Sequence, residues 1–188
     1  MMKNLNQWLF LSINNLAGKN DVLDNIGVFL GEKGPFIFIG LIVYIYFKKQ
    51  NKKEAIYATI TVISAILLNH LIELFYYHPR PFADGLGIVL KEHIADSSFP
   101  SDHTTFMLAL SWSLFMYKDT KRWGKNMLIL GVLLGLCRVF EGVHYPFDIL
   151  GALVMGHFCA NMIYKLKEKM KPLIDLILKI DNKIFRKA

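Results

Sequence analysis

Five uncharged apolar runs divide the chain, and polar or charged segments separate them. A transmembrane helix needs about 20 apolar residues, so most of these runs must extend through a charge near the membrane surface. Aromatic residues lie near several run ends, as they do at membrane interfaces. The pattern predicts one all-α membrane domain over residues 1–188, a polytopic bundle of about five transmembrane helices. The runs are Gly34–Phe47, Ala55–Ile72, Thr104–Tyr117, Asn126–Cys137 and Ile149–Tyr164.

Amphipathic segments flank these runs at both ends of the chain. Residues Asp21–Leu30 place apolar side chains on one face behind Asp21, a suitable N-cap, and predict a helix on the outer membrane surface. Residues Leu5–Ala17 are short for a span and contain Asn14 and Asn15, so five spans remain the favoured count. Residues Pro172–Phe185 carry a Leu/Ile stripe opposite Lys and Asn, which predicts a second helix on the membrane surface.

Charge then orients the bundle. The chain is 54% hydrophobic yet 20% charged, with a net charge of +7, so the charges must be segregated. Nucleic acid is an unsuitable partner, because the basic residues lie in short loops between apolar runs, the positive-inside pattern of membrane proteins. We expect a cytoplasmic C-terminus and a bilayer setting, with oligomeric state left open. The basic clusters are Lys48, Lys49, Lys52 and Lys53; Lys118, Lys121, Arg122 and Lys125; and the basic residues from Lys165 to the C-terminus.

The cysteines and the first ten residues say less about fold and function. Cys137 and Cys159 both lie within apolar segments, where we interpret them as small core residues and not as a disulfide. The first ten residues lack a continuous apolar core and a small-residue cleavage site, so no signal peptide is evident.

Three polar segments interrupt the apolar pattern, at residues 78–82, 99–103 and 137–148. Ionisable groups at membrane depth are costly and usually functional. The orientation set by the basic clusters places all three segments on the outer side. This convergence is informative, because the orientation was derived from other loops. We therefore expect them to gather into one extracytoplasmic site.

The residue types in these segments favour phosphoryl transfer. Residues 100–103 (PSDH) mark a helix start, whose free N–H groups can bind an anion. His144 and Asp148 are four residues apart, so the carboxylate can keep one ring nitrogen protonated and leave the other free to attack. Arg80 and Arg138 supply cations suited to phosphate oxygens. Alone, each motif could be a helix cap or an arginine reaching toward lipid headgroups; together they fit one phosphate.

Two rival chemistries are less favoured. His93, His103, His144 and Asp148 are numerous enough to bind zinc, but no HExxH or paired-Cys spacing occurs and two arginines would repel the ion. A Ser101-His-Asp hydrolase lacks a GxSxG context. We therefore expect neither a metal nor another cofactor.

The three segments resemble the motifs of the type 2 phosphatidic acid phosphatase superfamily, KxxxxxxRP, PSGH and SRxxxxxHxxxD. Residues 80–81 match the end of the first motif, residues 100–103 the second, and Arg138, His144 and Asp148 the third. Within the superfamily, YxxPRPF at 76–82, ADxSFPSDHTT at 95–105 and HYPxD at 144–148 are similar to the bacitracin-resistance type of bacterial undecaprenyl-diphosphatase.

The resemblance implies roles and a reaction. His144 would attack the terminal phosphorus and form a phosphohistidine, Asp148 would orient it, and His103 would protonate the leaving lipid phosphate. The transferred group would be held by Arg80, Ser101 and Arg138 and by the backbone at Asp102 and His103. The family reaction needs no metal. Undecaprenyl diphosphate, a prenyl diphosphate lipid, would be cleaved to undecaprenyl phosphate on the outer face, which returns the carrier to peptidoglycan synthesis.

Three positions depart from the family pattern. The family lysine is replaced by Glu73, which removes a cation unless this carboxylate holds an arginine in place. The serine before the third-motif arginine is Cys137, and the glycine of the second motif is Asp102, which would repel phosphate unless it points away. Lys91 and His93, in the loop before the second motif, are interpreted as solvated residues and not as ligands of the second phosphate.

Two alternative functions remain. The same site residues would serve a broader lipid phosphatase or phosphotransferase acting on phosphatidylglycerol phosphate or phosphatidate. A non-catalytic membrane subunit of a transporter or assembly complex would tolerate loss of His144.

Overall fold

The computed structural model describes residues 2–48 and 51–185 and consists of six helices joined by loops. Three residues of the predicted basic clusters, Lys49, Arg186 and Lys187, lie outside the described residues. Five of the helices correspond to the five predicted apolar runs, and one precedes them. The helices are α1 (Met2–Asn14), α2 (Asp21–Phe47), α3 (Lys52–Phe75), α4 (Asp102–Phe115), α5 (Lys121–Phe140) and α6 (Pro146–Phe185).

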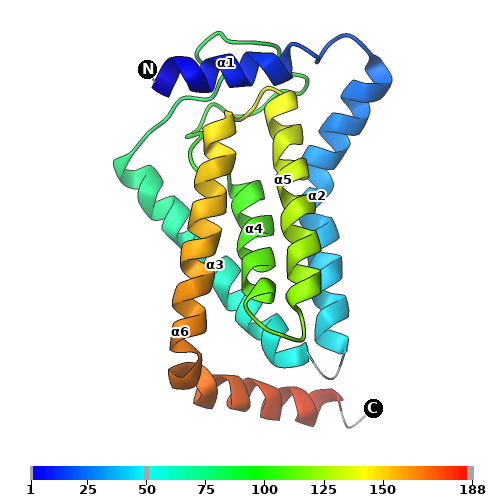
Figure 1. Ribbon diagram of the computed structural model, residues 1–188, viewed down its shortest axis with the longest axis vertical. Coiled ribbons are helices and arrows are strands. Elements are labelled where there is room, and N and C mark those ends of the chain that lie inside the picture. The colour runs from blue at the N-terminus through cyan, green and yellow to red at the C-terminus, as the bar shows by residue number, and fades with distance from the viewer. Residues whose placement is uncertain (1, 49–50, 186–188) are drawn as a thin grey trace.

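Helix α4 lies in the middle of the bundle, with α3, α5 and α6 around it (Figure 1). Its Met107, Leu110 and Leu114 are almost completely buried in the main hydrophobic core. Glycines allow its neighbours to approach closely: a Cβ at Gly124 of α5 or Gly156 of α6 would lie within 3 Å of the α4 backbone or its C-terminal end. Small residues serve this purpose in membrane bundles, where close backbone packing drives helix association.

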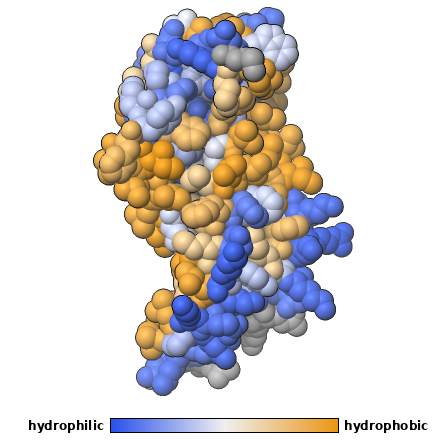
Figure 2. Space-filling model, turned by 60° about the vertical axis from the view of Figure 1, so that its left-hand side comes forward, coloured by the Kyte–Doolittle hydropathy of each residue, from blue (hydrophilic) through white to orange (hydrophobic). Residues whose placement is uncertain are grey.

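The predicted all-α membrane bundle is confirmed, and the described residues contain no strand. Helices α2, α3, α5 and α6 are long and apolar enough to cross a membrane. Helix α4 has 14 residues and is enclosed by the others, which accounts for the difference from about five spans. Figure 2 shows the corresponding surface, an apolar band between two hydrophilic ends.

The prediction of a separate surface helix over Asp21–Leu30 is wrong, because these residues form the first part of the continuous helix α2. Asn20, and not Asp21, caps this helix, since its side chain accepts from the N–H groups of Val22 and Leu23. Gly27, Gly31 and Gly34 are buried against α5, and the apolar face that suggested a surface helix is the exposed side of α2.

The interfacial helix at the N-terminal end is instead α1, which lies across one end of the bundle (Figure 1). Its buried face carries Asn6, Phe10 and Asn14, whereas Leu5 and Trp8 are exposed. At the opposite end, the last part of α6 lies across the bundle, as predicted for residues Pro172–Phe185 (Figure 1). Asp181 fixes it there by accepting hydrogen bonds from Tyr46 and Lys52, both at 2.5 Å.

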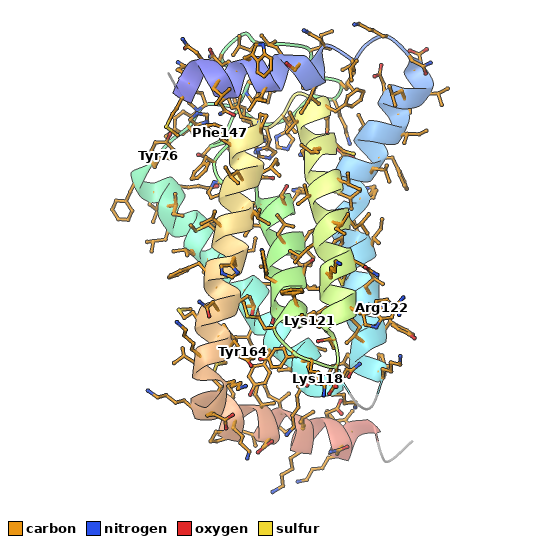
Figure 3. All side chains as sticks on the ribbon, viewed as in Figure 1. Tyr76, Lys118, Lys121, Arg122, Phe147 and Tyr164 are labelled. Atoms are coloured by element: carbon orange, nitrogen blue, oxygen red, sulfur yellow. The ribbon has the colours of Figure 1, made fainter. Side chains whose placement is uncertain are left out.

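The two ends of the bundle differ in charge. Figure 3 places Lys118, Lys121 and Arg122 at the end opposite α1, and Phe147 beside α1. The loop from α3 to α4 and the turn from α5 to α6 both lie at the α1 end (Figure 1). The three polar segments of the sequence therefore share the end of the bundle that is remote from the basic loops.

Candidate active site

A polar cavity of about 240 Å³ lies beneath the loops at the α1 end. Its walls come from the end of α3, the α3–α4 loop, the start of α4, the end of α5 and the α5–α6 turn. Two arginines and four histidines line it, together with three carboxylates. The lining residues are His70, Glu73, Arg80, His93, Asp96, Ser97, Pro100, Asp102, His103, Arg138 and His144.

His144 sits in the turn between α5 and α6 and is 3% exposed. Its Nδ1 lies 3.0 Å from the carbonyl oxygen of Ser98, so a proton on Nδ1 is donated there and Nε2 keeps its lone pair. Burial, and then the charges of Arg80 and Arg138, hold the pKa of His144 well below its ordinary value. The imidazole is therefore neutral at physiological pH, the form that a nucleophile requires.

Asp148 stands behind His144 in the first turn of α6. Its Oδ2 lies 3.4 Å from Nδ1 of His144 and accepts hydrogen bonds from the Tyr145 N–H and the Ser98 hydroxyl. The carboxylate is thus fixed by the turn and the α3–α4 loop, and it reinforces the Nδ1 tautomer of His144. The Ser98 carbonyl is nearer to that nitrogen than Asp148 is, so orientation of the imidazole is shared between the two.

Arg80 lies beside the imidazole and is 6% exposed. Its Nη1 is 3.2 Å from Nε2 of His144 and donates to the Val143 carbonyl at 2.9 Å. Its Nε donates to Asp96 at 2.6 Å. These contacts hold a fixed cation at the face of His144 where a phosphorus atom would be attacked.

Arg138, on the last turn of α5, is held by an acid that sequence reasoning missed. Its Nη1 donates to Glu141 at 2.6 Å, and both side chains are 1% exposed. Arg138 makes no other side-chain hydrogen bond within residues 2–48 and 51–185. Glu141 therefore fixes one nitrogen of the guanidinium while the group lines the cavity.

The second motif forms the start of α4. Ser101 is the N-cap, is fully buried, and bonds Thr104 through its hydroxyl at 3.0 Å. Its neighbours Pro100 and Asp102 line the cavity, but Ser101, predicted to hold the phosphate, does not. His103 lines the cavity, and the first N–H groups of a helix lack intrahelical partners, which suits an anion.

Asp102 accepts a hydrogen bond from Asn69 of α3 at 2.9 Å. This contact draws one carboxylate oxygen toward α3. Asn69 is fully buried and also donates to Thr105 at 2.9 Å. It was not predicted, although a lone amide in an apolar run was the available signal.

Glu73 lines the cavity but makes no salt bridge in the described part of the chain. The acids that pair with the arginines are Asp96 and Glu141. Cys137 is half-buried on α5 and a free thiol, as expected of a packing residue.

The residues that sequence reasoning missed carried signals of different strength. Asp96 and Ser98 belong to the ADxSFPSDHTT segment, and Glu141 lies inside the third motif. Their positions in the sequence therefore indicated that they could belong to the site. Asn6 of α1 accepts from the Phe147 N–H at 3.0 Å and so caps the start of α6 from outside. Nothing in its local sequence indicated that contact.

A second hollow, of about 480 Å³, lies on the other side of Asp148, between α1 and the first turn of α6. Tyr76, Phe99, Tyr145 and Phe147 make its lining mostly apolar. It contains neither arginine of the motifs, so the smaller polar cavity is the candidate active site. Within the described residues, no group of three His, Cys, Asp or Glu is arranged to hold a metal ion.

Comparisons with known proteins find relatives over most of the chain. A model of the PAP2 superfamily matches residues 54–171. The chain is 36% identical to undecaprenyl-diphosphatase BcrC of Bacillus subtilis (strain 168), over 97% of this chain and 95% of that protein. It is 30% identical to the bacitracin transport permease protein BcrC of Bacillus licheniformis, over 96% and 91%. The crystal structure of LpxE from Aquifex aeolicus shares the fold, with a TM-score of 0.72 at 22% identity, over 86% and 95% of the two chains.

Proposed function

Because the chain belongs to the PAP2 superfamily, we propose that it is a membrane undecaprenyl-diphosphate phosphatase, which hydrolyses undecaprenyl diphosphate to undecaprenyl phosphate and phosphate. The relative named for this activity is 36% identical over nearly the whole chain. One structural observation carries the chemistry: the neutral Nε2 of His144 lies in the same cavity as two arginines.

In the first step, Nε2 of His144 attacks the terminal phosphorus, and the bond from phosphorus to the bridging oxygen breaks. Burial, and then the charges of Arg138 and His93, lower the pKa of the free His103 to about 4. The anionic diphosphate opposes these effects and favours the imidazolium when it binds. His103 then gives its proton to that oxygen, so the lipid phosphate leaves as undecaprenyl phosphate. Arg80 and Arg138 stabilise the charge on the transferred oxygens, with the N-terminus of α4 behind Ser101. Asp148 and the Ser98 carbonyl stabilise the positive charge that develops on His144.

In the second step, water attacks the phosphohistidine. His103, now neutral, takes a proton from that water, and the phosphorus–nitrogen bond breaks to release phosphate. The enzyme returns to its starting state with both histidines in their original protonation states. The whole of residues 1–188 acts as one phosphatase domain in this proposal, because α6 supplies Asp148 and α1 contacts the start of α6 through Asn6.

The proposed orientation places this site on the extracytoplasmic side and the C-terminus in the cytoplasm. Its support is that Lys118, Lys121 and Arg122 lie at the end opposite α1 (Figure 3), whereas the loops that line the cavity lie at the α1 end. A carrier lipid regenerated on the outer face would return to cell-wall synthesis. Its regeneration would contribute to resistance to the antibiotic bacitracin.

A transport role is the second candidate, because a 30% identical relative is named as a bacitracin transport permease protein. A phosphatase with a broader range of lipid monophosphates would use the same residues. The buried His144 with its fixed tautomer favours catalysis over either a passive subunit or a simple channel.

The decisive experiment is phosphate release by the purified protein. We expect release from undecaprenyl and farnesyl diphosphates, persistence of activity in EDTA, and inhibition by vanadate. His144→Ala should lose nearly all turnover, since it removes the proposed nucleophile. His157→Ala is the matched control, because His157 packs edge-on against Trp112 and does not line the cavity. Full activity of His144→Ala would support the transport role instead.

A further inference from the structure

His93 lines the catalytic cavity although it belongs to none of the three motifs. It lies in the loop between α3 and α4, and its Nδ1 is 3.2 Å from the carbonyl oxygen of Ile94. Within the described ranges, Nε2 of His93 has no hydrogen-bond partner. Lys91, two residues earlier, is held by Glu32 at 2.6 Å and does not line the cavity. The structure thus distinguishes His93 from Lys91, although the sequence suggested that both were solvated loop residues.

The residues around His103 are mainly basic. Electrostatic interactions link His103 to Arg138, His93 and Arg80. Asp96 also lies on this side, because it pairs with Arg80 and acts on His93. On the other side, Glu73 and Asp102 interact with each other and with His70. We call these sides the basic wall and the acidic wall, and an anion that extends beyond the catalytic groups is favoured at the basic wall.

The reaction geometry directs the leaving group toward that same wall. In phosphoryl transfer, the nucleophile and the leaving oxygen lie on opposite sides of phosphorus. His144 occupies one side, so the bridging oxygen must lie next to the general acid His103. The phosphate that stays on the lipid is bonded to this oxygen. It consequently lies beyond His103, where His93 is the neighbouring side chain with a free ring nitrogen.

We propose that His93 binds the lipid-linked phosphate of the substrate and makes the cavity selective for diphosphates over monophosphates. This inference rests on the proposed phosphatase function and adds a substrate class to it. Burial, with the charges of Arg80 and Arg138, lowers the pKa of the free His93. A bound phosphate reverses part of that effect by favouring the imidazolium, whose Nε2–H then donates to a phosphate oxygen.

The test compares His93→Ala and His93→Gln with wild type, using farnesyl diphosphate as substrate. Loss of a hydrogen bond to a charged group should raise KM by about tenfold or more in the alanine variant, with little change in kcat. The glutamine variant keeps a neutral donor and should show a smaller rise. A second readout is inhibition by inorganic pyrophosphate and by orthophosphate. Inhibition by pyrophosphate should weaken in both variants, whereas inhibition by orthophosphate should not change.

His157→Ala is the control. His157 packs against Trp112 and does not line the cavity. It should leave both readouts unchanged. Equal weakening of pyrophosphate and orthophosphate inhibition in His93→Ala, or no change in either, would overturn the inference. A wild-type protein that releases no phosphate from any prenyl diphosphate would refute the proposed function itself.

Discussion

Arg138 and Glu141 show how much of the site depends on single buried contacts. The pair joins two residues three positions apart, and Gly31 of α2 packs so closely that a Cβ there would lie 3.1 Å from Arg138 and 3.2 Å from Glu141. Nε of Arg138 and Oε1 of Glu141 have no partner in the described structure. The ion pair is therefore enclosed by the fold, so water cannot take the place of either partner.

Glu141→Gln tests this arrangement. Removing one charge from a buried pair leaves the other uncompensated, which costs about 3 kcal/mol. We expect a clearly lower thermal midpoint in detergent, and kcat/KM lower by about tenfold because the guanidinium loses its fixed position. The measurements are thermal unfolding and prenyl diphosphate turnover.

Glu32→Gln is the control for this change. Its partner Lys91 is 54% exposed, and surface pairs contribute little to stability. Its thermal midpoint should stay near the wild-type value. Similar losses in both variants would show that the buried pair has no special part in the site.

Sequence reasoning reached the reactive residues but not all of their partners. His144, Asp148, Arg80 and Arg138 carry recognisable spacing, because chemistry needs those side chains at those positions. Glu141 has no such spacing, since any acid that reaches the guanidinium within the fold would serve. The partner of a functional residue is set by tertiary packing, which a single sequence does not display.

At the scale of elements, α1 lies outside the cavity and joins two of the segments that form it. Asn14 donates to the carbonyl oxygens of Ile88 and Phe140 at 2.8 and 2.9 Å and accepts from the Ile88 N–H at 2.7 Å. One side chain thus joins α1 to the α3–α4 loop and to the end of α5. Gly87 makes room for it, because a Cβ at this position of φ +68° would lie 2.2 Å from the Asn14 oxygen.

Asn14→Ala should loosen this junction. It leaves partly buried backbone groups of Ile88 and Phe140 without these partners, at a combined cost of about 1–3 kcal/mol. We expect a lower thermal midpoint, reduced turnover, and faster hydrogen exchange in the α3–α4 loop. Asn15→Ala is the control, because the neighbouring Asn15 is exposed. Unchanged exchange in the loop of Asn14→Ala would show that α1 is only an attached surface helix.

The elements themselves were largely predictable, and their ends were not. Apolar runs located α2 to α6, because bilayer depth imposes length and composition. The start of α2 was misplaced, since an exposed apolar face looks the same on a surface helix and on the outer side of a span. Only the packing of Gly27, Gly31 and Gly34 against α5 separates these two cases.

At the scale of the whole molecule, function depends on which way the bundle faces. The loops that line the cavity lie at the α1 end, and Lys118, Lys121 and Arg122 lie at the opposite end (Figures 1 and 3), so the orientation of one end fixes that of the other. From the positive-inside rule we propose that Lys118, Lys121 and Arg122 lie in the cytoplasm and the cavity outside. A lipid carrier used on the outer face could then be recycled without first crossing the membrane.

Cysteine labelling in intact cells tests this orientation. In a background without the native thiols (Cys137→Ser, Cys159→Ala), Lys19→Cys lies in the exposed loop between α1 and α2, and Lys121→Cys lies at the other end. A membrane-impermeant maleimide should label the first variant directly and the second only after the membrane is permeabilised. Each variant should retain phosphatase activity, because neither position lines the cavity. Labelling in the reverse order would place the cavity in the cytoplasm, and the enzyme would then act on lipid diphosphates made or returned on the inner face.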